Sequence, residues 1–299
     1  MSVLLLGGNG QVGTALRAAL AQSDRAWRTS TRSGELPDGT PCARCDLSIP
    51  GSAAGLIATL RPEVIVNATA YTAVDRAESE PQLAQRINAD AVAEIGDAAK
   101  KIGARVLHYS TDYVFAGDAM QPYRESDSTD PQSAYGRSKR DGEMALQSSG
   151  AEVLILRLAW VFAAEGQNFL RTMLRVGAER DSLSVVADQL GAPTPAHWIA
   201  RASLKAIDAE LQGLYHLTPQ GQTSWHAYAE ALFAQAVERG LLARAPQVQA
   251  ITSNDYPTPA RRPAWSVLDS TAIARDAGIA LPHWSLGVAE VLDQIATAR

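Results

Sequence analysis

Three glycines spaced three residues apart near the start of the chain most strongly limit what it can fold into. Gly7, Gly10 and Gly13 follow an apolar run at 3–6, and residues 14–21 have the apolar spacing of a helix. A strand, a glycine-rich turn and a helix in this order begin a dinucleotide-binding βαβ unit. The first glycine permits the turn, the second lets backbone approach a pyrophosphate, and the third lets helix and strand pack closely. A purely structural turn is the alternative interpretation.

Strands and helices alternate through residue 157, which predicts an α/β fold with a Rossmann-type, doubly wound and mostly parallel sheet. Strands are predicted at 26–31, 63–67, 105–110 and 153–157, and helices at 88–101 and 134–146. Beyond these we predict helices at 168–178, 199–211, 224–240 and 284–295, strands at 183–187 and 213–217, and a loop at 188–194. We therefore expect a dinucleotide-binding domain over 1–160, its sheet completed by parts of 183–217. A smaller α/β substrate domain over 161–299 is expected to interleave with it.

The composition argues against several classes of partner. The chain has 299 residues and a net charge of −5, which disfavours non-specific binding to nucleic acid or to an anionic membrane. It has no apolar run as long as a membrane span and no basic leader at its start, so we expect a cytoplasmic protein. Two cysteines, Cys42 and Cys45, lack the further ligands that a zinc site needs, which favours free thiols.

The end of the second predicted strand indicates which dinucleotide is used. An acidic residue there holds the ribose 2′-hydroxyl of NAD, whereas an arginine accommodates the 2′-phosphate of NADP. Here the strand ends in Ser30 and Thr31 and is followed by Arg32, with no acid before Glu35. These residues favour NADPH, leave NADH possible, and have a solvated loop as their structural alternative. Further along, residues 45–48 are predicted to form the end of a short strand, from which Asp46 is expected to reach the adenine amine.

The chemistry is predicted to lie in Tyr135-Gly-Arg-Ser-Lys139. Tyr135 and Lys139 are four residues apart on a predicted helix and therefore share one face. A phenol has a pKa of about 10, and a nearby ammonium lowers it toward the working range. Thr111, at the end of a neighbouring strand, is expected to hydrogen-bond the same substrate oxygen. A chance pair on an exposed helix is the alternative, and the α/β context with a glycine turn argues against it.

A proline-rich loop near the C-terminus carries two adjacent cations. The loop spans 256–265 and includes Arg261 and Arg262. It is either a plain basic surface loop or an anchor for an anionic substrate such as a diphosphate. We take Arg262 as the candidate anchor.

Together these motifs resemble the extended short-chain dehydrogenase/reductases and, within them, the dTDP-4-dehydrorhamnose reductase family. The likeness runs through nearly the whole chain. The segments that carry it are Gly10-Gln-Val-Gly13, Asn67-Ala-Thr-Ala-Tyr-Thr-Ala-Val-Asp-Arg-Ala-Glu78, Ser110-Thr-Asp-Tyr-Val-Phe115, Tyr135-Gly-Arg-Ser-Lys139, Asn168-Phe-Leu-Arg-Thr-Met-Leu174, Asp188-Gln-Leu-Gly-Ala-Pro-Thr194 and Tyr256-Pro-Thr-Pro-Ala-Arg-Arg-Pro263.

The resemblance implies an NAD(P)H-dependent oxidoreductase that reduces the C4 keto group of dTDP-4-dehydro-L-rhamnose to give dTDP-L-rhamnose. This is the last step in making a nucleotide sugar that feeds lipopolysaccharide and O-antigen biosynthesis. Tyr135 would donate the proton, Lys139 would tune Tyr135 and hold the nicotinamide ribose, and Thr111 would orient the carbonyl.

The glycine motif, the small residues after the strand at 63–67 and the resemblance together define the candidate binding residues. Those for the cofactor are Gly7, Gly10, Gln11, Val12, Gly13, Arg32, Asp46, Leu47, Ala68, Ala70, Tyr71, Thr72, Tyr135 and Lys139. Those for the nucleotide-sugar substrate are Thr111, Asp112, Trp160 and Arg262.

Two departures from the family pattern affect the cofactor and metal predictions. Family members often carry an acid where this chain has Ser30 and Thr31, which strengthens the expectation of NADPH. Some members are dimers bridged by magnesium through acidic side chains, but Thr14 and Ala15 follow the glycine turn here. We therefore predict no metal, and either a monomer or a homodimer.

Other functions of the same fold stay open to different degrees. A 4,6-dehydratase needs a second carboxylate after the Thr-Asp pair, and Tyr113 stands there instead. A C4 epimerase or another sugar-nucleotide 4-ketoreductase would share these residues, and an epimerase would retain tightly bound NAD. A non-catalytic, NADP-binding regulatory subunit has no chemical need for Thr111, Tyr135 and Lys139 together.

Overall fold

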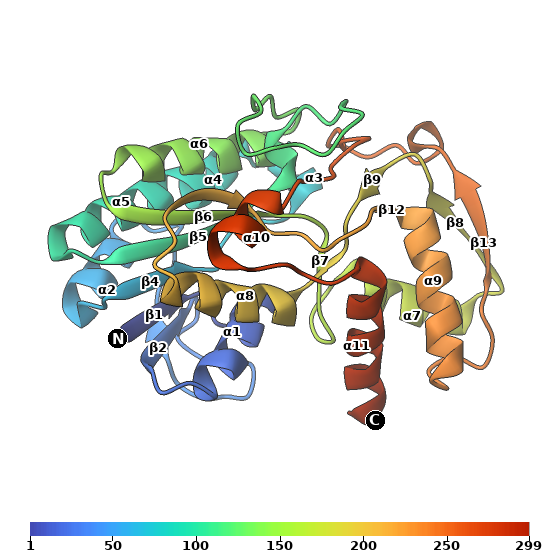
Figure 1. Cartoon of the computed structure of the whole chain (residues 1–299), viewed down its shortest axis with the longest axis horizontal. Coiled ribbons are helices and arrows are strands. Elements are labelled where there is room, and N and C mark those ends of the chain that lie inside the picture. The colour runs from blue at the N-terminus through green and yellow to red at the C-terminus, as the bar shows by residue number, and fades with distance from the viewer. Residues whose placement is uncertain (299) are drawn as a thin grey trace.

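The computed structural model describes residues 1–298 and is built around a seven-stranded sheet (Figure 1). Its strands are β1 (Ser2–Leu6), β2 (Ala26–Thr31), β3 (Ala43–Arg44), β4 (Val64–Asn67), β5 (Arg105–Thr111), β6 (Glu152–Leu158) and β11 (Gly213–His216). All are parallel, in the order β11-β6-β5-β4-β1-β2-β3. The strand order reverses at β1, so the crevice where doubly wound sheets bind ligands lies at the carboxyl ends of β1 and β4.

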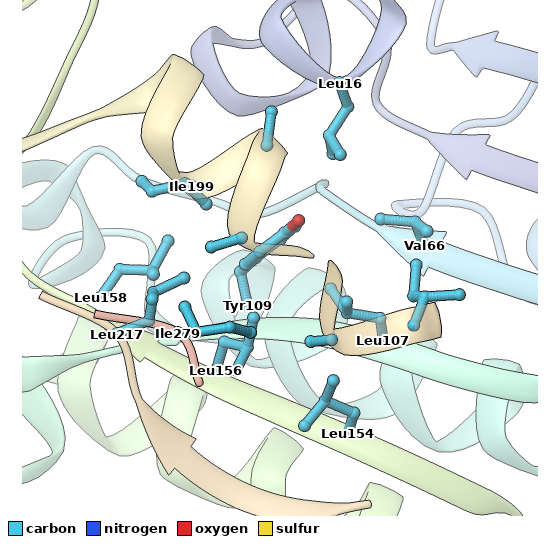
Figure 2. Packing of buried hydrophobic residues seen from close by; sticks show 14 of the residues in the cluster. Leu16, Val66, Leu107, Tyr109, Leu154, Leu156, Leu158, Ile199, Leu217 and Ile279 are labelled. Carbon is cyan, nitrogen blue, oxygen red and sulfur yellow. The ribbon is translucent and has the colours of Figure 1, made fainter. Parts of the chain in front are cut away.

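The central strands are apolar on both faces because helices cover both. In β1, Val3 and Leu5 pack into one buried cluster, while Leu4 and Leu6 pack into another. The first cluster, part of which is shown in Figure 2, lies under helices α1 (Gln11–Ala21), α8 (Ala196–Asp208) and α10 (Thr271–Ala277). The second lies under α2 (Ser52–Leu60), α5 (Ala91–Ile102) and α6 (Ala134–Ser148). The predicted doubly wound α/β sheet is thus confirmed.

Several element boundaries differ from those predicted. Helix α1 begins at Gln11, three residues before the predicted start, because Gly10 is its N-cap. The first three residues of the helix predicted at 88–101 belong to a π-helical turn, η1 (Arg86–Asp90), which follows α4 (Pro81–Gln85) and leads into α5. Between β4 and α4 lies a single turn, α3 (Val74–Ala77), and a 3₁₀ turn, η2 (Asp112–Val114), follows β5.

The C-terminal part has its own hydrophobic core beside the carboxyl end of the sheet (Figure 1). Its helices are α7 (Phe169–Glu179), α9 (Trp225–Glu238) and α11 (Trp284–Thr297), and its paired strands are β8 (Ser182–Val186) with β13 (Gln247–Ile251), β7 (Val161–Phe162) with β10 (Thr194–Pro195), and β9 (Leu190–Gly191) with β12 (Thr223–Ser224). A 3₁₀ turn, η3 (Ser253–Asp255), follows β13. Ser224 caps α9, accepting a hydrogen bond from the Ala227 backbone N–H.

The chain crosses between these two parts more than once. Strand β11 and helix α8 both follow residue 160, yet β11 extends the main sheet beside β6 and α8 packs against α1. The predicted strand at 183–187 is β8, which pairs with β13 outside the main sheet, and the predicted loop at 188–194 contains β9 and β10. The division at residue 160 stays a prediction. Within residues 1–298, no helix combines the length and the apolar character needed to cross a bilayer.

Candidate active site

The glycine turn between β1 and α1 leaves a backbone surface open to a ligand. Gly7 has φ +86°, and a Cβ on Gly13 would lie 2.0 Å from the Gly7 carbonyl oxygen, so the fold itself requires glycine at both positions. Gly10 differs, because a Cβ there would meet nothing closer than 3.7 Å. The first N–H groups of a helix lack intrahelical acceptors. Within residues 1–298, no side chain caps α1, so the N–H groups of Gln11 and Val12 are not occupied by a cap. This geometry fits the pyrophosphate of a dinucleotide.

Basic and acidic side chains meet where the adenosine ribose of a dinucleotide would lie. Arg44 on β3 is paired in register with Thr31 on β2, and Arg32 follows directly. Both arginines are exposed. Partial burial raises the pKa of Asp46, but hydrogen bonds from Ser48, and to a smaller extent the charges of Arg32 and Arg44, lower that pKa below its ordinary value. Arg44 was not predicted from the sequence, because its proximity to Arg32 depends on the strand register.

The loop after β4 carries the remaining predicted cofactor residues, of which Ala68, Ala70 and Tyr71 are half-buried and Thr72 is exposed. The Tyr71 backbone N–H donates to Asn88 Oδ1 (2.8 Å), and Asn88 Nδ2 lies 3.0 Å from both the Tyr71 carbonyl and Ser138 Oγ. Asn88 therefore fixes this loop to α6. Sequence reasoning missed Asn88, since its role depends on the π-helical turn η1.

Leu47 and Gln11, two further residues predicted to bind the cofactor, are held by contacts with other parts of the chain. Leu47 is buried in the cluster under α2. Gln11 accepts a hydrogen bond at its Oε1 from Asn168 Nδ2 (2.9 Å), the side chain that also caps α7. The start of α1 is thus linked directly to the C-terminal part.

Tyr135 lies in the first turn of α6, held by the Ser133 cap, whose Oγ accepts from the Gly136 N–H (3.1 Å). Burial raises the pKa of Tyr135 above its ordinary value, and a hydrogen bond with Thr111 only partly opposes this. The phenol is therefore neutral near pH 7 and carries a proton that it can donate. The ring of Tyr113 packs edge-on against it, with centroids 5.6 Å apart.

Lys139 is buried one helical turn further along α6. Its Nζ donates to the Tyr109 carbonyl (2.7 Å) and lies 3.2 Å from His108 Nε2, both on β5. Burial lowers the pKa of Lys139 to about 8, and the carboxylate of Glu143 partly opposes the shift. The sequence predicted that Lys139 would lower the pKa of Tyr135. In the structure burial outweighs any such effect, because the hydrogen bonds of Lys139 are directed to β5.

Thr111 and Asp112 form a buried polar pair at the end of β5. Thr111 Oγ1 donates to Asp112 Oδ1 (2.9 Å) and accepts from the Tyr113 N–H (3.2 Å). Burial raises the pKa of Asp112 to about 6, although the hydrogen bond from Thr111 and the neighbouring backbone N–H groups favour the carboxylate. Within residues 1–298, Asp112 Oδ2 is buried with no hydrogen-bond partner.

Arg262 reaches the same region from the proline-rich loop. It donates to Tyr113 Oη (3.1 Å) and to Asp75 Oδ2 (2.7 Å), so the loop is joined to η2 and α3. Arg262 also borders a cavity of about 340 Å³, whose other lining residues are Phe169, Thr172, Met173, Ser184, Val185, Val186, Gln189, Trp225, Tyr256 and Thr258.

Trp160 contacts Trp225, one of the residues that line this cavity. It adopts a left-handed backbone conformation with φ +47° and stacks on Trp225, with ring centroids 3.6 Å apart. The structure therefore brings Thr111, Asp112, Tyr135 and Arg262 together around Tyr113, and it places Trp160 beside the cavity that Arg262 borders.

Comparison with known proteins agrees with this architecture. The family model described as the RmlD substrate binding domain matches residues 1–297. The dTDP-4-dehydrorhamnose reductase of Salmonella typhimurium is 44% identical over 302 residues, covering 99% of each chain. A crystal structure of a dTDP-4-dehydrorhamnose reductase from Clostridium acetobutylicum superposes with a TM-score of 0.90 at 32% identity, covering 99% of each chain.

A second solved structure bears on the cofactor. The dTDP-4-dehydrorhamnose reductase of Bacillus anthracis, in complex with NADP, has a TM-score of 0.90 at 29% identity and covers 98% of this chain and 99% of its own. The family model and the curated relative each span essentially the full length. This chain belongs to the dTDP-4-dehydrorhamnose reductase family.

Proposed function

We propose that this chain reduces the C4 keto group of dTDP-4-dehydro-L-rhamnose to dTDP-L-rhamnose, with NADPH as the preferred reductant. The observation that carries the proposal is the group formed by Thr111, Tyr135 and Lys139 at the carboxyl end of β5. It lies in a chain whose relatives along their full length are reductases of this name. A scaffold that only bound the cofactor would have no use for a buried lysine and a neutral phenol beside a strand end.

The roles of the residues follow from their protonation states. NADPH, when bound, supplies the hydride that C4 accepts. Tyr135 transfers its phenolic proton to the carbonyl oxygen, which becomes the new hydroxyl, so proton and hydride together complete the reduction. Thr111, hydrogen-bonded to Tyr135, orients the carbonyl oxygen. Lys139, with its pKa lowered to about 8, can supply a proton to Tyr135 after turnover.

The substrate is proposed to lie between α6 and the C-terminal part. Arg262 presents a cation beside Tyr113 and is suited to the diphosphate, since a guanidinium binds phosphate oxygens with two parallel hydrogen bonds. The cavity that Arg262 borders, with Trp225 in its wall and Trp160 stacked behind, suits a nucleoside. Asp112 Oδ2 is suited to accept from a sugar hydroxyl.

The preference for NADPH rests on the cations beside β2. Arg32 and Arg44 offer two charges to a 2′-phosphate, and β2 ends without an acid that would bind a ribose 2′-hydroxyl. NADH is expected as a poorer substrate. We place the reaction in the cytoplasm, in keeping with the free thiols of Cys42 and Cys45, and propose that the protein acts as a monomer or homodimer.

The proposal is tested by incubating the protein with NADPH and dTDP-4-dehydro-L-rhamnose and identifying the sugar nucleotide by NMR. Stoichiometric formation of dTDP-L-rhamnose and NADP is the expected result. C4 of this substrate is a carbonyl carbon and has no configuration to invert, so an epimerase is tested separately with dTDP-L-rhamnose. Conversion of dTDP-L-rhamnose to its C4 epimer without net NADPH oxidation would identify an epimerase. NADPH binding without turnover would favour a regulatory subunit.

A further inference from the structure

Behind Lys139 lies a buried chain of polar groups that the proposed reaction does not use directly. It runs from Lys139 Nζ to His108 Nε2 (3.2 Å), and from His108 Nδ1 to Asn67 Nδ2 (3.0 Å). Asn67 Oδ1 then accepts from the Thr69 backbone N–H (3.1 Å) and from the Thr69 hydroxyl. The chain thus connects α6, through the neighbouring strands β5 and β4, to the loop proposed to bind the cofactor.

The direction of each hydrogen bond in this chain is fixed by the Thr69 backbone. An N–H can only donate, so the Asn67 atom that faces Thr69 is the amide oxygen and the one that faces His108 is the amide nitrogen. Because Nδ2 also donates, His108 Nδ1 must be the acceptor. Burial lowers the pKa of His108 well below its ordinary value, so the imidazole is neutral and its single proton is on Nε2.

This tautomer has a consequence for Lys139. An Nε2–H directed at Nζ is satisfied only by the lone pair of a neutral amine, because an ammonium has three donors and no acceptor. We propose that His108 is a positioning residue: held by Asn67 with its proton on Nε2, it opposes a positive charge on Lys139. The amine then releases its proton readily, as a residue that reprotonates Tyr135 must do. The kinetic consequence rests on the proposed reductase activity, whereas the tautomer does not.

Other charged groups around Lys139 act in known directions. Glu143, on the same helix, favours the ammonium, but its carboxylate accepts two hydrogen bonds, from Nε and Nη2 of Arg157 on β6. His108, on β5, is disfavoured as a cation by Lys139 itself. Burial lowers the pKa of Lys139 against the effect of Glu143, and the proposed Nε2–H of His108 acts in the same direction as burial.

The charged and polar groups on the other elements packed against α6 interact with residues of that helix other than Lys139. Asp112 and Tyr113, from η2, raise the pKa of Tyr135. Asn88, from η1, is neutral and bonds to Ser138, and Glu78, beside α3, accepts from the Ala134 backbone N–H.

The tautomer is measured by nitrogen NMR on the full chain with labelled histidine. Of the five histidines, the signal of His108 is identified by its loss in His108→Gln. At a pH above the pKa of Lys139, the proposal requires the proton on Nε2. A proton on Nδ1 in the wild-type protein would overturn it.

The kinetic test uses Asn67→Asp, which replaces the donor at His108 by an acceptor and retains acceptors for Thr69. His108 must then carry its proton on Nδ1 and offer Nε2 to the ammonium. The fall in NADPH-dependent kcat/KM at alkaline pH should move up by about one pH unit or more, the scale of a new carboxylate interaction. Thr69→Val, which keeps the backbone N–H and therefore the tautomer, should leave the alkaline limb in place.

The outcomes of the kinetic and NMR tests distinguish a failure of the proposed role of His108 from a failure of the proposed reductase activity. An unchanged alkaline limb in folded Asn67→Asp would overturn it. If Asn67→Asp does not fold, the wild-type tautomer decides alone. If the wild-type protein does not reduce the substrate, the proposed function fails, and the NMR spectrum still tests His108.

Discussion

The carboxylate of Glu143 and the guanidinium of Arg157 form a two-pronged pair, with Nε–Oε1 2.9 Å and Nη2–Oε2 2.6 Å, and both side chains are almost wholly buried. The pair joins the helix that carries Tyr135 and Lys139 to β6. Arg157 also lies 4.9 Å over the ring of Phe115. It therefore contributes to the position of α6 relative to the sheet.

Removing one member of this pair should destabilise the protein strongly. Arg157→Met leaves Glu143 buried and unpaired, and we expect the free energy of unfolding to fall by about 3–5 kcal/mol in denaturant titrations. The double variant Glu143→Leu with Arg157→Met should regain at least half of that loss, since no isolated charge remains. A single variant as stable as wild type would contradict the structural role.

Gly10 and Gly13 should respond differently to alanine. Gly13→Ala places a Cβ against the Gly7 carbonyl, so we expect the free energy of unfolding to fall by about 3 kcal/mol or more. Gly10→Ala has room within the fold and should cost about 1 kcal/mol, the scale of a changed N-cap. It should nevertheless weaken NADPH binding tenfold or more in fluorescence titrations. Unchanged binding in Gly10→Ala would argue against a pyrophosphate at this turn.

Ionised Asp112 should lower the free energy of unfolding at neutral pH, because its carboxylate is buried in the site. Its folded pKa of about 6 exceeds its ordinary 3.8, so the folded state binds the proton more tightly and stability is lost as pH rises through this window. Asp112→Asn should therefore be more stable than wild type at about pH 8, by at most about 3 kcal/mol. The gain should shrink toward about pH 4, and activity should fall. Equal stability gains at both pH values would contradict the assigned ionisation.

Arg32 and Arg44 should set the preference for NADPH. Replacing either with serine removes a charged hydrogen bond to the 2′-phosphate, so we expect kcat/KM with NADPH to fall about tenfold or more. The kcat/KM with NADH should stay within about twofold of the wild-type value, since NADH has a hydroxyl in place of that phosphate. Arg171→Ser, at an exposed position on α7, is the control. An equal loss with both cofactors would show that neither arginine reads the phosphate.

Local sequence patterns predicted much of this architecture. The spacing of Gly7, Gly10 and Gly13 predicted the turn, and apolar runs predicted β1, β4, β5 and β6. The largely polar β2 and the short β11 were also predicted, whereas β3 ends at Arg44, just before the strand end expected at 45–48. These features depend on neighbours in the sequence. The two-residue strands and β13 were missed because their pairing is formed by residues far apart in the chain.

The same distinction applies to the site. The four-residue spacing of Tyr135 and Lys139 predicted their shared helix, but not the contacts of Lys139 with His108 and the Tyr109 carbonyl. Arg262 was singled out as a cation in a proline-rich loop. Its partner Asp75 is 187 residues away, and no local pattern connects them.

The most direct test follows the loss of reduced-nicotinamide absorbance when the protein meets dTDP-4-dehydro-L-rhamnose and NADPH, with wild type and Tyr135→Phe compared side by side. Tyr135→Phe keeps the ring that packs on Tyr113 and removes only the proton donor. The account predicts consumption by wild type and a fall of about a hundredfold or more in the variant. Consumption at the wild-type rate by folded Tyr135→Phe would contradict the role of Tyr135 as the proton donor.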